Sequence, residues 1–270
     1  MPQLLTDPRH TLDAVIATAH QVAREEIMPR FMKVIHHCKD DGTLLSEADL
    51  ACQRFLLERL PDIVNCPVIG EEMPRSRQEA ALEEGNGDVW CIDPIDGTTN
   101  FVNGLPVFAV SIALLREGKP CLGVTYNPVS NEMFYACRGG GAHLNGKRLP
   151  LRQVTRRLDQ AVANVDLKRL PKALATRLAT EPPYFSQRNF GSSALEWCQV
   201  AAGRIDVAVH GGQMLWDFAA GSLILEEAGG HLCTLDSDDF HGDDPWRRRI
   251  VAALDPEVFA AWRDWLRATS

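Results

Sequence analysis

The feature that most constrains this chain is the segment 89–100, in which an apolar stretch runs directly into two acids. Its first four residues have the composition of a buried strand, and Asp93 and Asp96 follow three residues apart. Pro94 stiffens the predicted turn so that the two carboxylates can point the same way, and Gly97 lets the backbone approach a ligand closely. The pattern therefore predicts a buried strand that leads into a ligand site.

Three further acids occupy comparable places. Glu71 follows a short strand-like run, while Asp217 and Asp49 lie at the starts of predicted helices. Each acid also has a purely structural explanation. Asp217 can be a helix N-cap, and Asp49 can close a capping box with Ser46. Asp93 and Asp96 can belong to a solvated turn. Their shared position at strand ends and helix starts favours one common site.

Convergence of Glu71, Asp93, Asp96 and Asp217 requires counter-charge. Two carboxylates about 4 Å apart repel by roughly 4 kcal/mol at an effective dielectric constant near 20. Hard divalent cations relieve this repulsion, and a ligand set made of oxygen without His or Cys favours magnesium or manganese over zinc. The acids therefore predict a binding site for magnesium or manganese ions.

Charge and composition exclude several other classes of protein. The formal net charge of -8 argues against a nucleic-acid surface, because phosphate backbones select basic faces. The longest apolar run, Val107–Leu115, is too short to span a bilayer, and the N-terminus lacks the pattern of a secretory signal. The eight cysteines form no C-x-x-C pair and are expected to be reduced thiols. We expect a cytoplasmic protein with no nucleic-acid or membrane partner.

The periodicity of apolar residues predicts layered helices and sheets. Helical spacing covers the first thirty or so residues and Ser46–Leu60, and a run of strands with a hairpin turn at Asn145–Gly146 follows. Beyond residue 150, strands and helices alternate. A length of 270 residues allows one large domain or two packed halves, and we place a soft boundary between an N-terminal half, 1–150, and a C-terminal half, 151–270. The predicted strands are 67–69, 88–92, 107–115, 121–126, 132–137, 161–165, 205–209 and 250–253, and the later helices are 171–179, 192–202, 216–228 and 256–266.

In this order along the chain, the motifs resemble those of the inositol monophosphatase family of metal-dependent, lithium-sensitive sugar and polyol phosphatases. The resemblance covers nearly the whole sequence. The motifs that carry it are Lys39 with Leu45–Asp49, Gly70–Glu72, Trp90–Phe101, Phe108–Ile112, Gly191–Ala194, Trp216–Asp217 and Glu227–Gly230.

The resemblance implies a fold, a set of ligands and an assembly. The fold is a mixed α+β or α/β layered αβαβα sandwich with the site between two packed halves, and homodimers are expected. Asp49, Thr98 and Glu71 are the expected catalytic residues, with Asp49 and Thr98 orienting the attacking water. The expected ligands of two or three Mg²⁺ ions, for which Mn²⁺ can substitute, are Glu71, Asp93, the carbonyl group of Ile95, Asp96 and Asp217.

The expected reaction is hydrolysis of a small phosphate monoester, such as an inositol 1-phosphate or another polyol or sugar phosphate, by a metal-activated water. A covalent route through Asp93 is disfavoured, because a carboxylate neutralised by a metal is a poor nucleophile. Histidinol phosphate, nucleotide and sugar bisphosphate substrates stay open. So does a regulatory binding protein that retains the fold without catalysis.

The expected substrate contacts include one departure from the family. A glutamate seven residues before the Trp-Asp aspartate typically accepts hydrogen bonds from inositol hydroxyls in the family, and this position holds His210. A neutral imidazole offers one acceptor where a carboxylate offers several, which weakens the case for myo-inositol 1-phosphate. Ser192 at the start of a helix can contact substrate or cap the helix. The full set of expected contacts is Ile95, Asp96, Gly97, Thr98, Gly191, Ser192, Ser193, His210 and Asp217.

Overall fold

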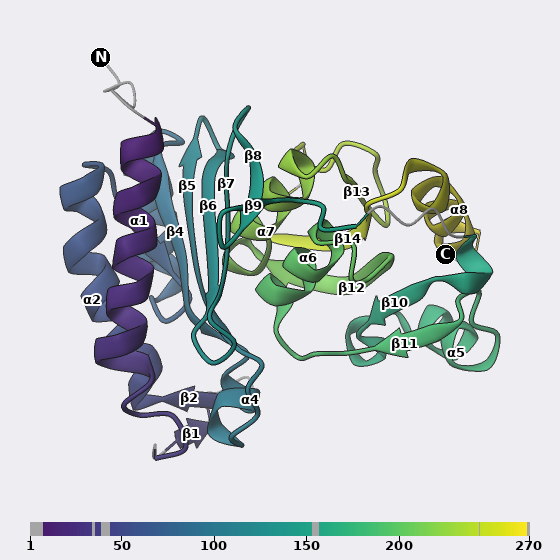
Figure 1. Cartoon of the computed structure of the whole chain (residues 1–270), viewed down its shortest axis with the longest axis horizontal. Coiled ribbons are helices and arrows are strands. Elements are labelled where there is room, and N and C mark those ends of the chain that lie inside the picture. The colour runs from purple at the N-terminus through teal and green to yellow at the C-terminus, as the bar shows by residue number, and fades with distance from the viewer. Residues whose placement is uncertain (1–7, 34–35, 39–43, 153–156, 243, 269–270) are drawn as a thin grey trace.

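The chain folds into five layers, helices and sheets alternating (Figure 1). The computed structural model describes residues 8–33, 36–38, 44–152, 157–242 and 244–268. Helices α1 and α2 cover one face of a seven-stranded sheet, α6 and α7 separate it from a five-stranded sheet, and α5 and α8 cover the far side (Figure 1). This arrangement confirms the predicted layered αβαβα sandwich.

The N-terminal layer is formed by two apolar helix faces packed on the large sheet. Helix α1 spans Pro8–Val22 and continues as a π-helical turn over Ala23–Ile27, while α2 spans Glu47–Ile63. Their buried residues form one core with Trp90 and Ile92 of the sheet. A small antiparallel pair, β1 over His36–Cys38 and β2 over Leu44–Ser46, connects the two helices. Lys39 of the family motif lies outside the described residues.

The large sheet has the order β3-β4-β5-β6-β7-β8-β9, with β3 and β4 parallel and the other neighbours antiparallel. Asn145 and Gly146 have φ angles of 47° and 81°, which confirms the predicted hairpin turn between β8 and β9. The strands are β3 Val68–Gly70, β4 Val89–Asp96, β5 Ala109–Arg116, β6 Lys119–Asn127, β7 Glu132–Cys137, β8 Gly141–Leu144 and β9 Lys147–Arg148. Helix α3, Arg75–Glu84, lies between β3 and β4, and α4, Thr98–Val102, follows β4.

The small sheet has the order β11-β10-β12-β14-β13. Its strands are β10 Val162–Val165, β11 Ser186–Arg188, β12 Val207–Met214, β13 His231–Thr234 and β14 Arg247–Ala253. The helices of this half are α5 Lys172–Thr180, α6 Ser193–Ala201, α7 Leu215–Glu227 and α8 Pro256–Arg267, with short 3-10 turns at Leu158–Gln160 and Leu167–Arg169. A central core joins α6 and α7 to the large sheet, and a separate core lies beneath α5 and α8.

The structure differs from the sequence-based expectations in a few elements. The strand before Asp93 was expected to end at Ile92, but β4 continues to Asp96 and includes both aspartates. Its register against β5 shifts between Asp93 and Asp96, so the expected turn is an irregularity within a strand. Helices α3 and α4 and strands β11 and β13 were not predicted. The division at 145–155 stays a prediction. In the described part of the chain, no helix is both long and apolar enough to cross a membrane.

Candidate metal and phosphate site

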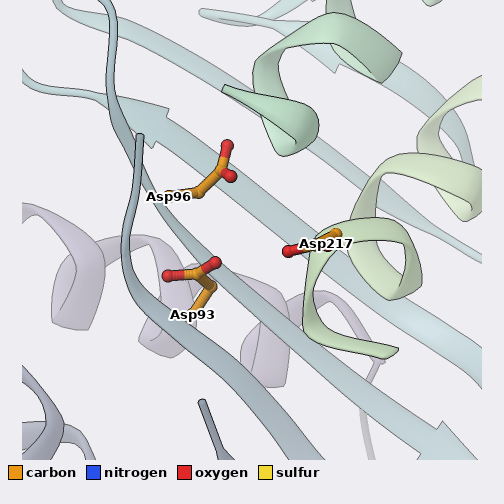
Figure 2. A group of neighbouring side chains, drawn as sticks. All are labelled: Asp93, Asp96 and Asp217. Atoms are coloured by element: carbon orange, nitrogen blue, oxygen red, sulfur yellow. The ribbon is translucent and has the colours of Figure 1, made fainter. Parts of the chain in front are cut away.

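Three aspartates from distant parts of the sequence meet at one point. Asp93 and Asp96 come from β4, and Asp217 comes from the first turn of α7. One carboxylate oxygen of each lies within 4.8 Å of the others. Figure 2 shows the Asp217 carboxylate pointing toward the two aspartates of β4. The strand irregularity places both acids of β4 on the side that faces α7.

Burial and mutual repulsion make this cluster unstable without counter-charge. Burial raises the pKa of Asp93 and Asp217 well above the usual range of an aspartate, and the neighbouring carboxylates raise both further. Burial also raises the pKa of Asp96 to about 6, although hydrogen bonds partly oppose this shift. Within the described residues no ion pair neutralises the three groups. Buried acids with oxygen as their only donor atoms fit a hard divalent cation such as Mg²⁺.

Asp96 also holds the start of helix α6 against β4. The backbone N–H groups of Ser193 and Ala194 donate to its two carboxylate oxygens at 3.1 and 2.8 Å, and the Ser192 hydroxyl donates to it as well. Of the two roles considered for Ser192, capping of α6 by its side chain is not found, because this hydroxyl donates to Asp96 and makes no cap hydrogen bond in α6. The contact fixes the position of α6 relative to the large sheet.

The other two aspartates each accept one local backbone hydrogen bond. The N–H of Ile95 donates to Asp93 Oδ1 at 3.1 Å, and the N–H of Met214 donates to Asp217 Oδ2 at 2.8 Å. These bonds fix the side-chain orientation of both acids. Each carboxylate keeps a second oxygen that can bind a ligand.

Asp49 and Thr98 form a second polar contact beside the cluster. Thr98 Oγ1 lies 3.3 Å from Asp49 Oδ1 and 3.1 Å from the carbonyl oxygen of Ile95. Asp49 Oδ2 accepts from the backbone N–H and the hydroxyl of Ser46 at 2.8 and 2.6 Å. Asp49 therefore closes the capping box of α2 and contacts Thr98 at the same time, and its expected role in orienting water stays a prediction.

A cleft of about 750 Å³ contains most of the predicted site residues. Glu71 lines this cleft and acts electrostatically on all three aspartates, although it lies outside their 4.8 Å group. Gly97 has φ 96°, and a Cβ atom there would lie 3.0 Å from the carbonyl oxygen of Val107 and 3.2 Å from that of Gly191. Glycine is therefore required at the bend between β4 and α4. Lining residues from the prediction are Glu71, Asp93, Ile95, Asp96, Gly97, Thr98, Gly191, Ser192, Ser193, His210 and Asp217.

Comparison with known proteins identifies the family. The sequence profile of the inositol monophosphatase family matches residues 8–264. The chain belongs to this family. The profile match confirms the resemblance seen in the sequence motifs.

Family members with known names and structures are similar over much of the chain. The sequence is 37% identical over 251 residues to inositol monophosphatase 2 of Solanum lycopersicum, covering 89% of this chain and 92% of that one. It is 42% identical over 177 residues to Nus factor SuhB of Pasteurella multocida, a match that spans 62% of either chain. The crystal structure of the extragenic suppressor protein suhB from Bartonella henselae superposes with a TM-score of 0.81 at 27% identity, covering 96% of this chain and 98% of that one.

His210 departs from the family pattern more strongly than the sequence alone indicates. Its Nδ1 already accepts a hydrogen bond from the N–H of Gly212 at 3.1 Å, and its Nε2 lies 3.7 Å from Asp166 Oδ2. Burial lowers its pKa to about 4, so the ring is neutral at pH 7 with the proton on Nε2. Its single acceptor is thus occupied. His210 cannot replace the family glutamate as an acceptor for polyol hydroxyls.

Five further charged residues line the cleft without having been predicted. Lys168 and Arg169 follow β10, Arg247 begins β14, and Asp166 and Glu196 lie near the cleft wall. Burial and the nearby Asp96 raise the pKa of Glu196 to about 8, so it is protonated at pH 7. No local motif marks these residues, because they come from loop ends and a helix interior that the fold alone brings together.

Proposed function

We propose that this chain is a Mg²⁺-dependent phosphomonoesterase that hydrolyses a small phosphate monoester with water. The observation that carries the proposal is the buried trio Asp93, Asp96 and Asp217, which no salt bridge neutralises among the described residues. Family membership supports the same reaction class. Asp93, Asp96 and Asp217 would hold the cation, with Glu71 and the carbonyl oxygen of Ile95 as further ligands from the same cleft.

When bound, Mg²⁺ supplies the Lewis acidity that activates the attacking water and stabilises charge on the leaving alkoxide. The rest of the chemistry is assigned to residues of this chain. Thr98 Oγ1 donates toward Asp49 Oδ1, which leaves its lone pairs free to accept a hydrogen bond from the attacking water. Asp49 is held in place by Ser46, so the pair positions the water along one direction. Gly97 gives the phosphate close access to the backbone.

Phosphate release from glycerol 2-phosphate and inositol 1-phosphate tests the proposal. We expect turnover with Mg²⁺, none with EDTA, and a loss of at least about a hundredfold in kcat/KM in Asp93→Asn, since the variant removes one negative charge from the ligands of the ion. Asp159→Asn is the matched control, because Asp159 is an exposed carboxylate paired with Arg157. Turnover that persists in EDTA would contradict the metal-dependent mechanism.

The alternative is a binding protein that retains the fold without catalysis. The similarity to proteins named Nus factor SuhB is the observation that favours it. This alternative predicts no phosphate release from any ester in the same assay. The assembled aspartates, the Asp49–Thr98 contact and the open cleft favour the enzyme. Lithium inhibition, a homodimer, a cytoplasmic location and the number of ions stay predictions of the family resemblance.

A further inference from the structure

The cleft has a cationic wall next to the aspartate cluster. We use this name for Lys168, Arg169 and Arg247, which line the same cavity as the carboxylates. Lys168 and Arg169 belong to the 3-10 turn after β10, and Arg247 is the first residue of β14. Three positive side chains from two separate segments thus face one space.

These cations are not used to stabilise the fold. No salt bridge or side-chain hydrogen bond involves any of the three among the described residues. Asp166 lines the same wall, but its Oδ1 accepts from the backbone N–H of Lys168 at 3.1 Å and its Oδ2 faces His210. Since His210 is neutral at pH 7, the wall keeps an excess of two positive charges.

Two glycines hold this wall close to strand β12. The register of β12 shifts between His210 and Gln213, and Gly211 and Gly212 occupy the irregularity. A Cβ atom on Gly211 would overlap the backbone carbonyl of Arg169, and one on Gly212 would overlap the guanidinium group of Arg247. The approach of the Arg169 backbone needs glycine at position 211, whereas the flexible Arg247 side chain can move away from a Cβ atom at position 212. The bulge therefore lets the Arg169 backbone and the Arg247 guanidinium group lie against β12.

The wall lies within reach of a molecule bound at the aspartates. Arg169 acts electrostatically on both His210 and Asp217, and Arg247 acts on His210. Arg169 thus lies close enough to influence both the aspartate cluster and His210. Guanidinium groups bind carboxylates and phosphates through paired N–H donors, whereas the hydroxyls of a neutral polyol find no free acceptor on His210.

We propose that the substrate carries a second anionic group, a carboxylate or a phosphate, remote from the phosphate that is cleaved, and that Arg169 and Arg247 bind it. This inference rests on the proposed phosphatase function and narrows its substrate class. A neutral polyol monophosphate would offer the two arginines no anionic group at the end remote from the cleaved phosphate. In an ester with an anionic tail, the phosphate that is cleaved binds the cation held by the aspartates, and the tail binds the cationic wall.

The test uses short alkanediol phosphates in a range of chain lengths, each with a hydroxyl, carboxylate or phosphate at the far end. At the best length we expect the anionic tail to raise kcat/KM at least about tenfold over the hydroxyl tail. This preference falls as salt is added, because the second contact is electrostatic. Comparison of kcat/KM between the esters with a carboxylate tail and those with a phosphate tail shows which anion the cationic wall prefers.

Variants assign the preference to the arginines. In the double variant Arg169→Gln, Arg247→Gln, the ratio of kcat/KM for anionic over neutral tails falls to about one. Arg157→Gln carries the same type of charge loss outside the cleft and keeps the preference; thermal unfolding confirms that each variant is folded. Equal kcat/KM for all tails in the unmodified chain, or a preference that survives the double variant, overturns the inference and leaves the phosphatase intact. Absence of Mg²⁺-dependent turnover with every ester refutes the proposed function, and this inference with it.

Discussion

Replacing Asp93 by Asn should stabilise the metal-free protein and abolish its stabilisation by Mg²⁺. Oxygens of the three aspartates lie within 4.8 Å of one another, so each ionised neighbour costs Asp93 about 3.5 kcal/mol at an effective dielectric constant near 20. Protonation of Asp93 avoids this repulsion but has its own cost. That cost is about 1.36 kcal/mol for each pH unit above the ordinary aspartate pKa near 3.9, which amounts to about 5.6 kcal/mol at pH 8. An asparagine oxygen can still accept from the N–H of Ile95.

We therefore expect Asp93→Asn to raise the free energy of unfolding in EDTA at pH 8 by about 2–4 kcal/mol, or Tm by roughly 5–10 °C. The sign follows from linkage: a pKa raised in the fold gives stability that is complete at low pH and is lost as pH rises through the folded value, about 6 for Asp96. The gain of the Asp93→Asn variant should consequently shrink as the pH falls from 8 toward the ordinary aspartate pKa near 3.9.

Urea or thermal unfolding with EDTA and with Mg²⁺ measures both effects. At ten times its dissociation constant, Mg²⁺ should stabilise the unmodified chain by about 1.4 kcal/mol and leave Asp93→Asn unchanged. Asp159→Asn removes an exposed carboxylate and should behave like the unmodified chain in both conditions. An Asp93→Asn protein that is less stable than the unmodified chain in EDTA would refute the electrostatic reasoning.

Three further predictions follow from the same structure. Thr98→Ala should lower kcat by about 10²-fold with little change in KM, measured by steady-state kinetics, because it removes the group that orients the water. The affinity for Mg²⁺ should rise from pH 5.5 to pH 7.5 in calorimetric titration, since the raised pKa of Asp96, about 6, means that protons must leave when the ion binds. Gly221→Ala in α7 should lower the free energy of unfolding by about 1–3 kcal/mol in urea, although Ala favours helices, because its Cβ would overlap Trp197 of α6.

Much of the fold could be predicted from periodicity, because its long elements carry strong patterns. Helix α2 has a Ser46–Asp49 capping box, α7 ends before two glycines, and the β8–β9 turn has the Asn-Gly pair that such hairpins prefer. Short elements such as β11 and α4 were missed, since three to five residues carry too little pattern. The end of β4 was misplaced because Pro94 indicates a turn, whereas the strand bulges there and resumes pairing at Asp96.

The acids of the site could be predicted, but the surroundings that give them their chemistry could not. Asp93 and Asp96 lie three residues apart in the sequence, and one short motif contains both. The hydrogen bonds from the start of α6 to Asp96 join residues almost a hundred positions apart, and no local pattern contains them. The cationic wall depends on glycines of β12 that admit Arg169 and Arg247, so it exists only in the folded chain.

The account depends on one physical claim, that the aspartates of β4 and α7 share a divalent cation. Anomalous X-ray scattering from crystals of the unmodified chain soaked in Mn²⁺ tests it most directly. We predict a strong peak in direct contact with oxygens of Asp93, Asp96 and Asp217, and none in Asp93→Asn crystals soaked in the same way. Active crystals with no manganese between these three side chains would contradict the claim.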